Sequence, residues 1–170
     1  MRARYGNLYF NTLYNKLLNM KFICCLLFIV AGLSSNAQKT NPDYDSTLAK
    51  KFGGDDYGMK MYVFVILKTG SNTTTDKALT DSLFAGHMSN INHMVSINKL
   101  LVAGPMVKND KTYRGIFILD VKTFEEAEKL LEKDPAIKEK LLAVEMYNWY
   151  GSAALPAYIE ASDKVSKLKF

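Results

Sequence analysis

The segment Met61–Lys68, MYVFVILK, is the part of the chain that decides the fold. Its β-branched and aromatic residues predict a β-strand. Alternate side chains of a strand point to opposite faces, and here Tyr62, Phe64 and Ile66 are as apolar as the alternate set of methionine, valine and leucine. The segment Gly115–Leu119, GIFIL, has the same property. A sheet built on these strands therefore needs cover on both faces.

The pattern around this strand predicts two helices and three further strands. The first helix is expected from about Asp81 to Lys99, because apolar residues recur there every three or four positions. Its expected inner face consists of Leu83, Phe84, Met88, Ile91, Met94 and Val95. The other expected elements are strands at Leu100–Ala103, Thr112–Val121 and Leu141–Tyr150, and a helix that starts with a capping box at Thr123–Glu126 and runs to about Lys133. The order β-α-β-β-α-β predicts an α+β, ferredoxin-like fold, with a four-stranded antiparallel sheet and both helices on one face.

The other face of this sheet needs a second cover. An apolar face of four strands is larger than the patch that a soluble monomer usually exposes. A second copy packed sheet to sheet would cover it, so we expect a homodimer. The alternative is that the C-terminal tail, whose spacing from Leu155 to Leu168 is helical, folds over the open face.

Residues 1–37 are typical of a secretory signal peptide. Met20-Lys21 precedes the apolar run Phe22–Leu33, and the small residues Ser35 and Ala37 predict cleavage after Ala37. A membrane anchor would need about 20 apolar residues, and this run is shorter. We therefore expect export to the periplasm or the medium without membrane insertion, whether translation starts at Met1 or Met20.

The chain after the leader divides into three parts. Residues 38–59 are polar and contain several glycines, so we expect a flexible lead-in. Residues 60–151 contain the predicted sheet and helices, and residues 152–170 form the helical tail.

Charge and cysteine content exclude several functions. Four of the 22 basic residues and none of the 17 acidic ones lie in residues 1–37, so the mature chain is almost neutral and has no basic block. A nucleic-acid or anionic-membrane partner is therefore not expected. Both cysteines, Cys24 and Cys25, lie in the leader, so the mature chain has no disulfide and no thiol chemistry.

The only histidines, His87 and His93, both lie on the first predicted helix. At about 100° per residue their side chains are roughly 120° apart, so the two rings cannot bind one metal ion from one helix. His93 lies beside Ser89 and Ser96, and we expect it to be solvated. We expect neither a metal site nor a cofactor, and no motif supports haem binding.

Several short motifs occur in a specific order between residues 60 and 151. They are His87 near the start of the first helix, AGP at 103–105, TFEEA at 123–127, DP at 134–135 and WYG at 149–151. In order and spacing the segment resembles the YCII-related (YciI-like) domain family. The resemblance implies the dimeric α+β barrel fold and a cleft near the dimer interface, where the helix histidine pairs with the aspartate of the DP motif. In this family the histidine lies 17 residues before the AGP glycine, which is the separation between His87 and Gly104, whereas His93 matches no family position.

The residues themselves support the same pair and leave alternatives open. His87 shares a helix face with apolar residues and suits acid–base catalysis if a carboxylate orients its ring. Asp134, at the end of the second helix, is the available carboxylate. The alternative for His87 is that it is a packed core residue. The alternative for Asp134, which precedes Pro135, is that it is an N-cap. One carboxylate has two oxygens and can fill both roles.

Three further residues are candidates for substrate binding. Tyr62 and Tyr113, on strands, could line the cleft, although aromatic residues on a sheet more often serve packing. Arg114 could hold a substrate carboxylate, with a surface ion pair as the alternative. The sequence thus predicts an exported homodimer that acts on a small molecule through His87 and Asp134. A non-catalytic ligand-binding or structural dimer is the alternative.

Overall fold

The computed structural model describes residues 41–167 of the chain. The predicted leader, residues 1–37, lies outside the described residues. In the part that is described, no helix combines the length and the apolar character that a membrane crossing requires.

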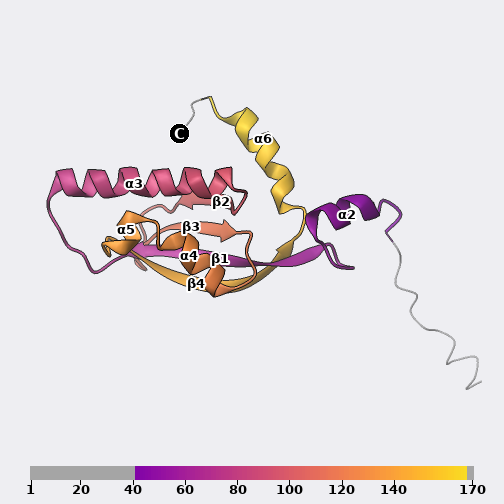
Figure 1. Cartoon of the computed structure of the whole chain (residues 1–170), viewed down its shortest axis with the longest axis horizontal. Coiled ribbons are helices and arrows are strands. Elements are labelled where there is room, and N and C mark those ends of the chain that lie inside the picture. Colours follow the sequence, from indigo (N-terminus) through magenta and orange to yellow (C-terminus); the bar gives the residue numbers. More distant parts are fainter. Residues whose placement is uncertain (1–40, 168–170) are drawn as a thin grey trace, which may run out of the picture. The chain divides into compact units, whose positions relative to one another are not determined.

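The described chain forms one four-stranded antiparallel sheet (Figure 1). The strands are β1 (Met59–Thr69), β2 (Leu100–Pro105), β3 (Tyr113–Leu119) and β4 (Leu142–Ser152), and their spatial order is β2-β3-β1-β4. With helix α3 (Lys77–Ser96) after β1 and helix α4 (Phe124–Leu131) after β3, the order of elements is the ferredoxin-like one. The predicted fold class is confirmed. The central position belongs to β1, which pairs with both β3 and β4.

The main core lies between the sheet and the helices. Val63, Val65 and Leu67 of β1 are buried there, and the same cluster contains buried residues of α3, α4 and the short helix α5 (Pro135–Lys138). Helix α4 begins as the sequence predicts, because the Thr123 hydroxyl accepts a hydrogen bond from the Glu126 amide at 3.2 Å. The helices thus cover one face of the sheet. After α4, the Asp134 amide donates to the Leu131 carbonyl at 3.0 Å.

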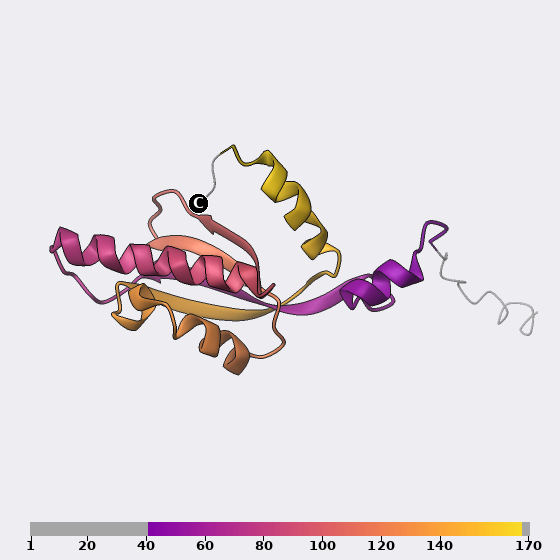
Figure 2. The ribbon, with the colours of Figure 1, turned by 45° about the horizontal axis from the view of Figure 1, so that its top comes forward.

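The C-terminal tail covers part of the other face. Its short 3-10 helix η1 (Leu155–Ala157) leads into helix α6 (Tyr158–Val165), and Figure 2 shows α6 on the side of the sheet opposite to α4. Leu155 and Ile159 pack against the buried side chains Tyr62, Leu101 and Ile118. The Tyr158 hydroxyl also donates to the Leu101 carbonyl at 2.7 Å. The tail was the less favoured of the two predicted covers, yet it provides the cover at this end of the face.

The rest of this face is less well covered. Phe64, Ile66 and Ile116 are half-buried, and half of the Tyr147 surface is exposed. A single 3-10 turn and an eight-residue helix are too short to cover four strands.

The segment predicted to be a flexible lead-in contains a helix, so that prediction is wrong for α2 (Ser46–Phe52). Asp45 caps its start by accepting from the amides of Thr47 and Leu48 at 2.8 and 2.9 Å. Gly53 ends it with φ of 70°, a left-handed conformation that glycine adopts without strain. Caps at both ends compensate for a short sequence without a clear apolar period.

Helix α3 also begins earlier than predicted, at Lys77 and not near Asp81. Asp76 is its N-cap, and its carboxylate accepts from the Leu79 amide at 3.1 Å. The first turn, residues 77–80, contains no buried residue, so the apolar period of the buried face does not extend to it.

We expect the variant Ile159→Asp to release the tail from the sheet. A carboxylate at this position would be placed against Tyr62 and Leu101, so the free energy of unfolding should fall by about 1–2 kcal/mol. Urea unfolding and the protease sensitivity of α6 measure the effect. Val165→Asp is the matched control, because Val165 lies on the same helix and is 82% exposed. Equal behaviour of the two variants would show that the tail does not contribute as described.

Candidate functional site

The buried side of α3 contains two polar residues. Its buried positions are Leu83, His87, Asn90 and Met94, which are spaced four, three and four residues apart. Two residues of the predicted inner face, Met88 and Val95, are instead 40% and 44% exposed, so their assignment was wrong. Asn90 was missed, although its three-residue spacing from His87 was a signal for a shared face. The buried side is shifted toward polar residues because those residues have partners beneath the helix.

His87 and Asp134 are in direct contact. The Nδ1 atom of His87 lies 2.5 Å from Oδ2 of Asp134, and both residues are buried. The other carboxylate oxygen accepts from the amides of Ala136 at 2.9 Å and Ile137 at 3.4 Å, which caps α5. Both predicted roles of Asp134, histidine partner and N-cap, are therefore compatible, because each uses a different oxygen.

Two aromatic rings hold the His87 ring in position. Phe117 of β3 stacks on it, with centroids 5.9 Å apart and planes within 22°. Phe84, one turn earlier on α3, meets it edge to face at 6.1 Å. About 10% of the His87 side chain is exposed. Within residues 41–167 the Nε2 atom has no hydrogen-bond partner, so it is available to water or a ligand.

The close approach of α3 and α5 depends on Gly86. A Cβ atom at this position would lie 2.3 Å from Cγ of Pro135, well inside van der Waals contact. Asn90 makes a second connection, donating from Nδ2 to the Leu130 carbonyl near the end of α4 at 3.2 Å. These two contacts set the position of α3 over the segment that carries Asp134.

The two tyrosines predicted to line the cleft lie on the other face of the sheet. Tyr62 pairs with Trp149 on the face that α6 covers, and its hydroxyl donates to the Ser152 carbonyl at 2.8 Å. Burial, and to a smaller extent the nearby charge of Asp120, raises the pKa of Tyr62 to about 12. Tyr113 pairs with Lys68 on the same face. Neither tyrosine can contact a molecule bound at His87, because the sheet lies between them.

Arg114 is the one predicted substrate-binding residue on the His87 side. Its guanidinium carbon lies 5.9 Å from the centroid of the Phe84 ring, which in turn contacts His87. His93 is exposed, as predicted. Among residues 41–167, no three histidine, cysteine, aspartate or glutamate side chains gather in a way that would hold a metal ion.

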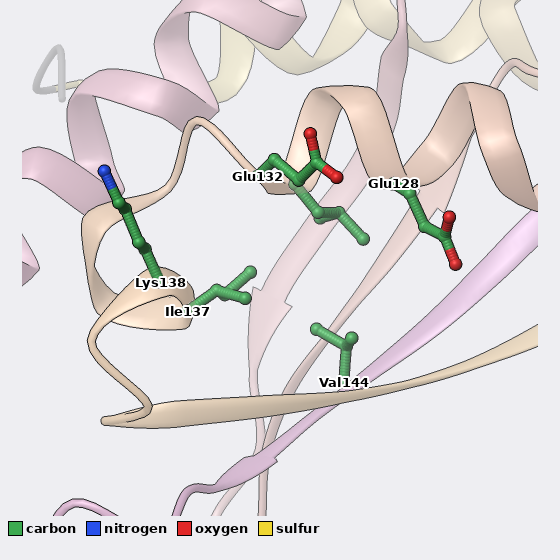
Figure 3. A pocket seen from close by; sticks show the side chains of 6 residues that line it. Glu128, Glu132, Ile137, Lys138 and Val144 are labelled. Atoms are coloured by element: carbon green, nitrogen blue, oxygen red, sulfur yellow. The ribbon is translucent and has the colours of Figure 1, made fainter.

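An open groove lies between α4, α5 and β4 (Figure 3). Ile137 and Val144 face its hollow, and Glu128, Glu132 and Lys138 surround it. Neither His87 nor Asp134 lines it. The groove is therefore separate from the histidine–aspartate contact.

Comparison with known proteins adds little. No protein-family model matches the chain, and no curated protein matches it. Among solved structures, it is similar to 5-chloro-2-hydroxyhydroquinone dehydrochlorinase (TftG) from Burkholderia phenoliruptrix AC1100, in complex with 2,5-dihydroxybenzoquinone. The identity is 19% and the TM-score 0.39, over 51% of this chain and 92% of that one.

We expect Gly86→Ala to separate α3 from α5. In an exposed helix this change stabilises by roughly 1 kcal/mol. Here the added methyl group collides with a rigid proline ring, so we expect a loss of about 1–3 kcal/mol in urea unfolding. Ser89→Ala, at an exposed position of the same helix, is the control and should have little effect. A Gly86→Ala protein as stable as the parent would contradict the close approach.

Proposed function

We propose that the protein is an acid–base enzyme that acts on a small organic molecule. His87 transfers a proton through Nε2, and Asp134 is a positioning residue that holds the ring. One observation carries this proposal. Nδ1 of the buried His87 is hydrogen-bonded to the Asp134 carboxylate, while Nε2 has no hydrogen-bond partner among residues 41–167. The resemblance of residues 60–151 to the YCII-related family points to the same two residues.

The chemistry follows from the tautomer that the aspartate favours. A carboxylate accepts hydrogen bonds, so it keeps the proton of a neutral imidazole on Nδ1. Nε2 then has a lone pair and can take a proton from a substrate, and the carboxylate stabilises the imidazolium that forms. The resulting imidazolium can return this proton to another atom of the same substrate. The Phe84 and Phe117 rings limit rotation of the imidazole, which favours one direction for the transfer.

The alternative is that the pair is only structural. Asp134 caps α5, and a hydrogen-bonded histidine can simply fill the core. This reading also requires the Nδ1–Oδ2 contact, so stability measurements alone do not separate the two. The protonation pattern of the ring and its response to ligands do.

We also propose that a second copy covers the rest of the open face. That part of the face combines half-buried Phe64, Ile66 and Ile116 with an ion pair between Lys68 and Glu145. In an isologous pairing the same patch meets itself, so the lysine of one copy can approach the glutamate of the other. The Lys68 ammonium, through its hydrogen bond, lowers the pKa of Glu145 below its usual value.

Export is a separate proposal, based on the sequence of residues 1–37. A basic start, a short apolar run and the small residues before Gln38 support removal of this segment. The mature protein then begins at Gln38 and contains no cysteine.

Asp134→Asn should change the tautomer of His87. The asparagine oxygen can still cap α5, but its amide donates to Nδ1, so the ring proton moves to Nε2. We expect ¹⁵N NMR to show the Nδ1–H form of neutral His87 in the parent and the Nε2–H form in the variant. His93, which is exposed, is an internal control and should not change. An Nε2–H form of His87 in the parent would refute the proposed role of Nε2 as the base.

Native mass spectrometry of protein recovered from the exported fraction tests the other two proposals. We expect a chain that begins at Gln38 and assembles into a dimer at micromolar concentration. Ile66→Lys, in the less covered part of the face, should give a monomer, whereas Val165→Asp should stay dimeric. A chain that retains the leader would contradict export, and a monomeric parent would contradict the pairing.

A further inference from the structure

Strand β3 contains one extra residue at Arg114. On the neighbouring strand β1, Leu67 pairs with Gly115 and Lys68 pairs with Tyr113, so Arg114 has no partner on β1 and the register shifts there. In a regular strand Arg114 would share a face with Ile116 and Ile118, on the side that α6 covers. A bulge bends the strand and re-aims its side chains.

The bulge brings the arginine to the helix side of the sheet. The guanidinium carbon lies within 5.9 Å of the Phe84 centroid, at the distance of a cation–π contact. Phe84 belongs to α3 and also contacts the His87 ring. Arg114 is exposed, and within residues 41–167 its side chain makes no ion pair and no hydrogen bond. Its guanidinium N–H groups therefore face solvent, one ring away from the proposed base.

We propose that Arg114 binds the acid group of the substrate, which is a small organic carboxylate. This inference rests on the proposed function of His87 and gives its substrate class. The planar guanidinium matches the two oxygens of a carboxylate through parallel N–H···O bonds. With the carboxylate on Arg114, the rest of a small molecule extends past Phe84 toward His87. The arginine thereby determines both which molecules bind and which of their atoms reaches Nε2.

The alternative is a guanidinium that only packs on an aromatic ring. Packing of Arg114 on the Phe84 ring uses the aliphatic part of the side chain and the planar guanidinium, and it does not require a ligand. It predicts no preference for anions at His87. A ligand titration therefore separates the two roles.

The test compares benzoate with its neutral analogue benzamide, which have nearly the same shape. The signals of the His87 ring are followed by NMR during titration of each compound. We expect benzoate to shift them in a saturable way and benzamide to bind at least tenfold more weakly. Benzoate is chosen because half-buried Phe84, which contacts both His87 and Arg114, offers aromatic surface to its ring.

Three variants locate the interaction. Arg114→Met keeps an apolar stem on Phe84 but has no charge, and we expect its Kd for benzoate to rise at least tenfold. Arg114→Lys keeps the positive charge but lacks the planar pair of N–H donors. We therefore expect its affinity for benzoate to lie between that of the parent and that of Arg114→Met. Lys111→Met, which loses one positive charge at an exposed position three residues away, is the control and should bind as the parent does.

The proposal is overturned by any of three results: benzamide binds as well as benzoate, Arg114→Met binds benzoate with unchanged affinity, or benzoate causes no saturable change at His87. These outcomes differ from failure of the acid–base proposal. A parent protein with an Nε2–H tautomer that still binds benzoate through Arg114 would remove the base and keep the carboxylate site. A parent protein with the Nδ1–H tautomer that does not bind benzoate through Arg114 would keep the base and remove the carboxylate site.

Discussion

The central strand β1 is apolar on both faces, and the structure depends on covering both. Val63, Val65 and Leu67 lie under the helices, whereas Tyr62 lies under the tail. Burial of such surface is the main driving force for folding. Strand β1 pairs with β3 over residues 63–68 and with β4 over residues 59–69, so it lies at the centre of the sheet. The segments that cover its two faces therefore also lie on the two faces of the whole sheet. The helix side carries the histidine, and the tail side carries the proposed contact with a second copy.

The helix side combines stability and chemistry in one carboxylate. One oxygen of Asp134 caps α5, and the other holds His87, so the cap positions the residue that orients the ring. A buried polar pair is costly unless its hydrogen bonds are made, and here the aspartate uses both oxygens. Gly86 makes the arrangement possible because any larger residue would push Pro135 away. A core contact and a candidate catalytic pair are therefore the same atoms.

The sheet separates two sets of polar residues that are close in sequence. Tyr113 points to the face with Lys68 and Glu145, while the next residue, Arg114, reaches Phe84 on the helix side. A single bulge causes this division. It brings a cation to the side of the sheet that carries the proposed base, and that is the arrangement expected for an anionic substrate.

The sequence by itself determined the four strands, the two helices between them and their order, because apolar period, capping residues and strand composition are local properties. It did not reveal α2, whose sequence has no clear apolar period. It also supplied both members of the His87–Asp134 pair, although the pairing depended on a family resemblance and on the chain order of two helices. Only the tertiary structure decided that Tyr62 and Tyr113 lie behind the sheet, that Asn90 replaces Met88 on the buried side of α3, and that the tail covers Tyr62. Those outcomes follow from a bulge, from the rotation of a helix about its axis and from contacts between residues up to about a hundred positions apart. Such features depend on which surfaces meet in space, and no local pattern encodes that.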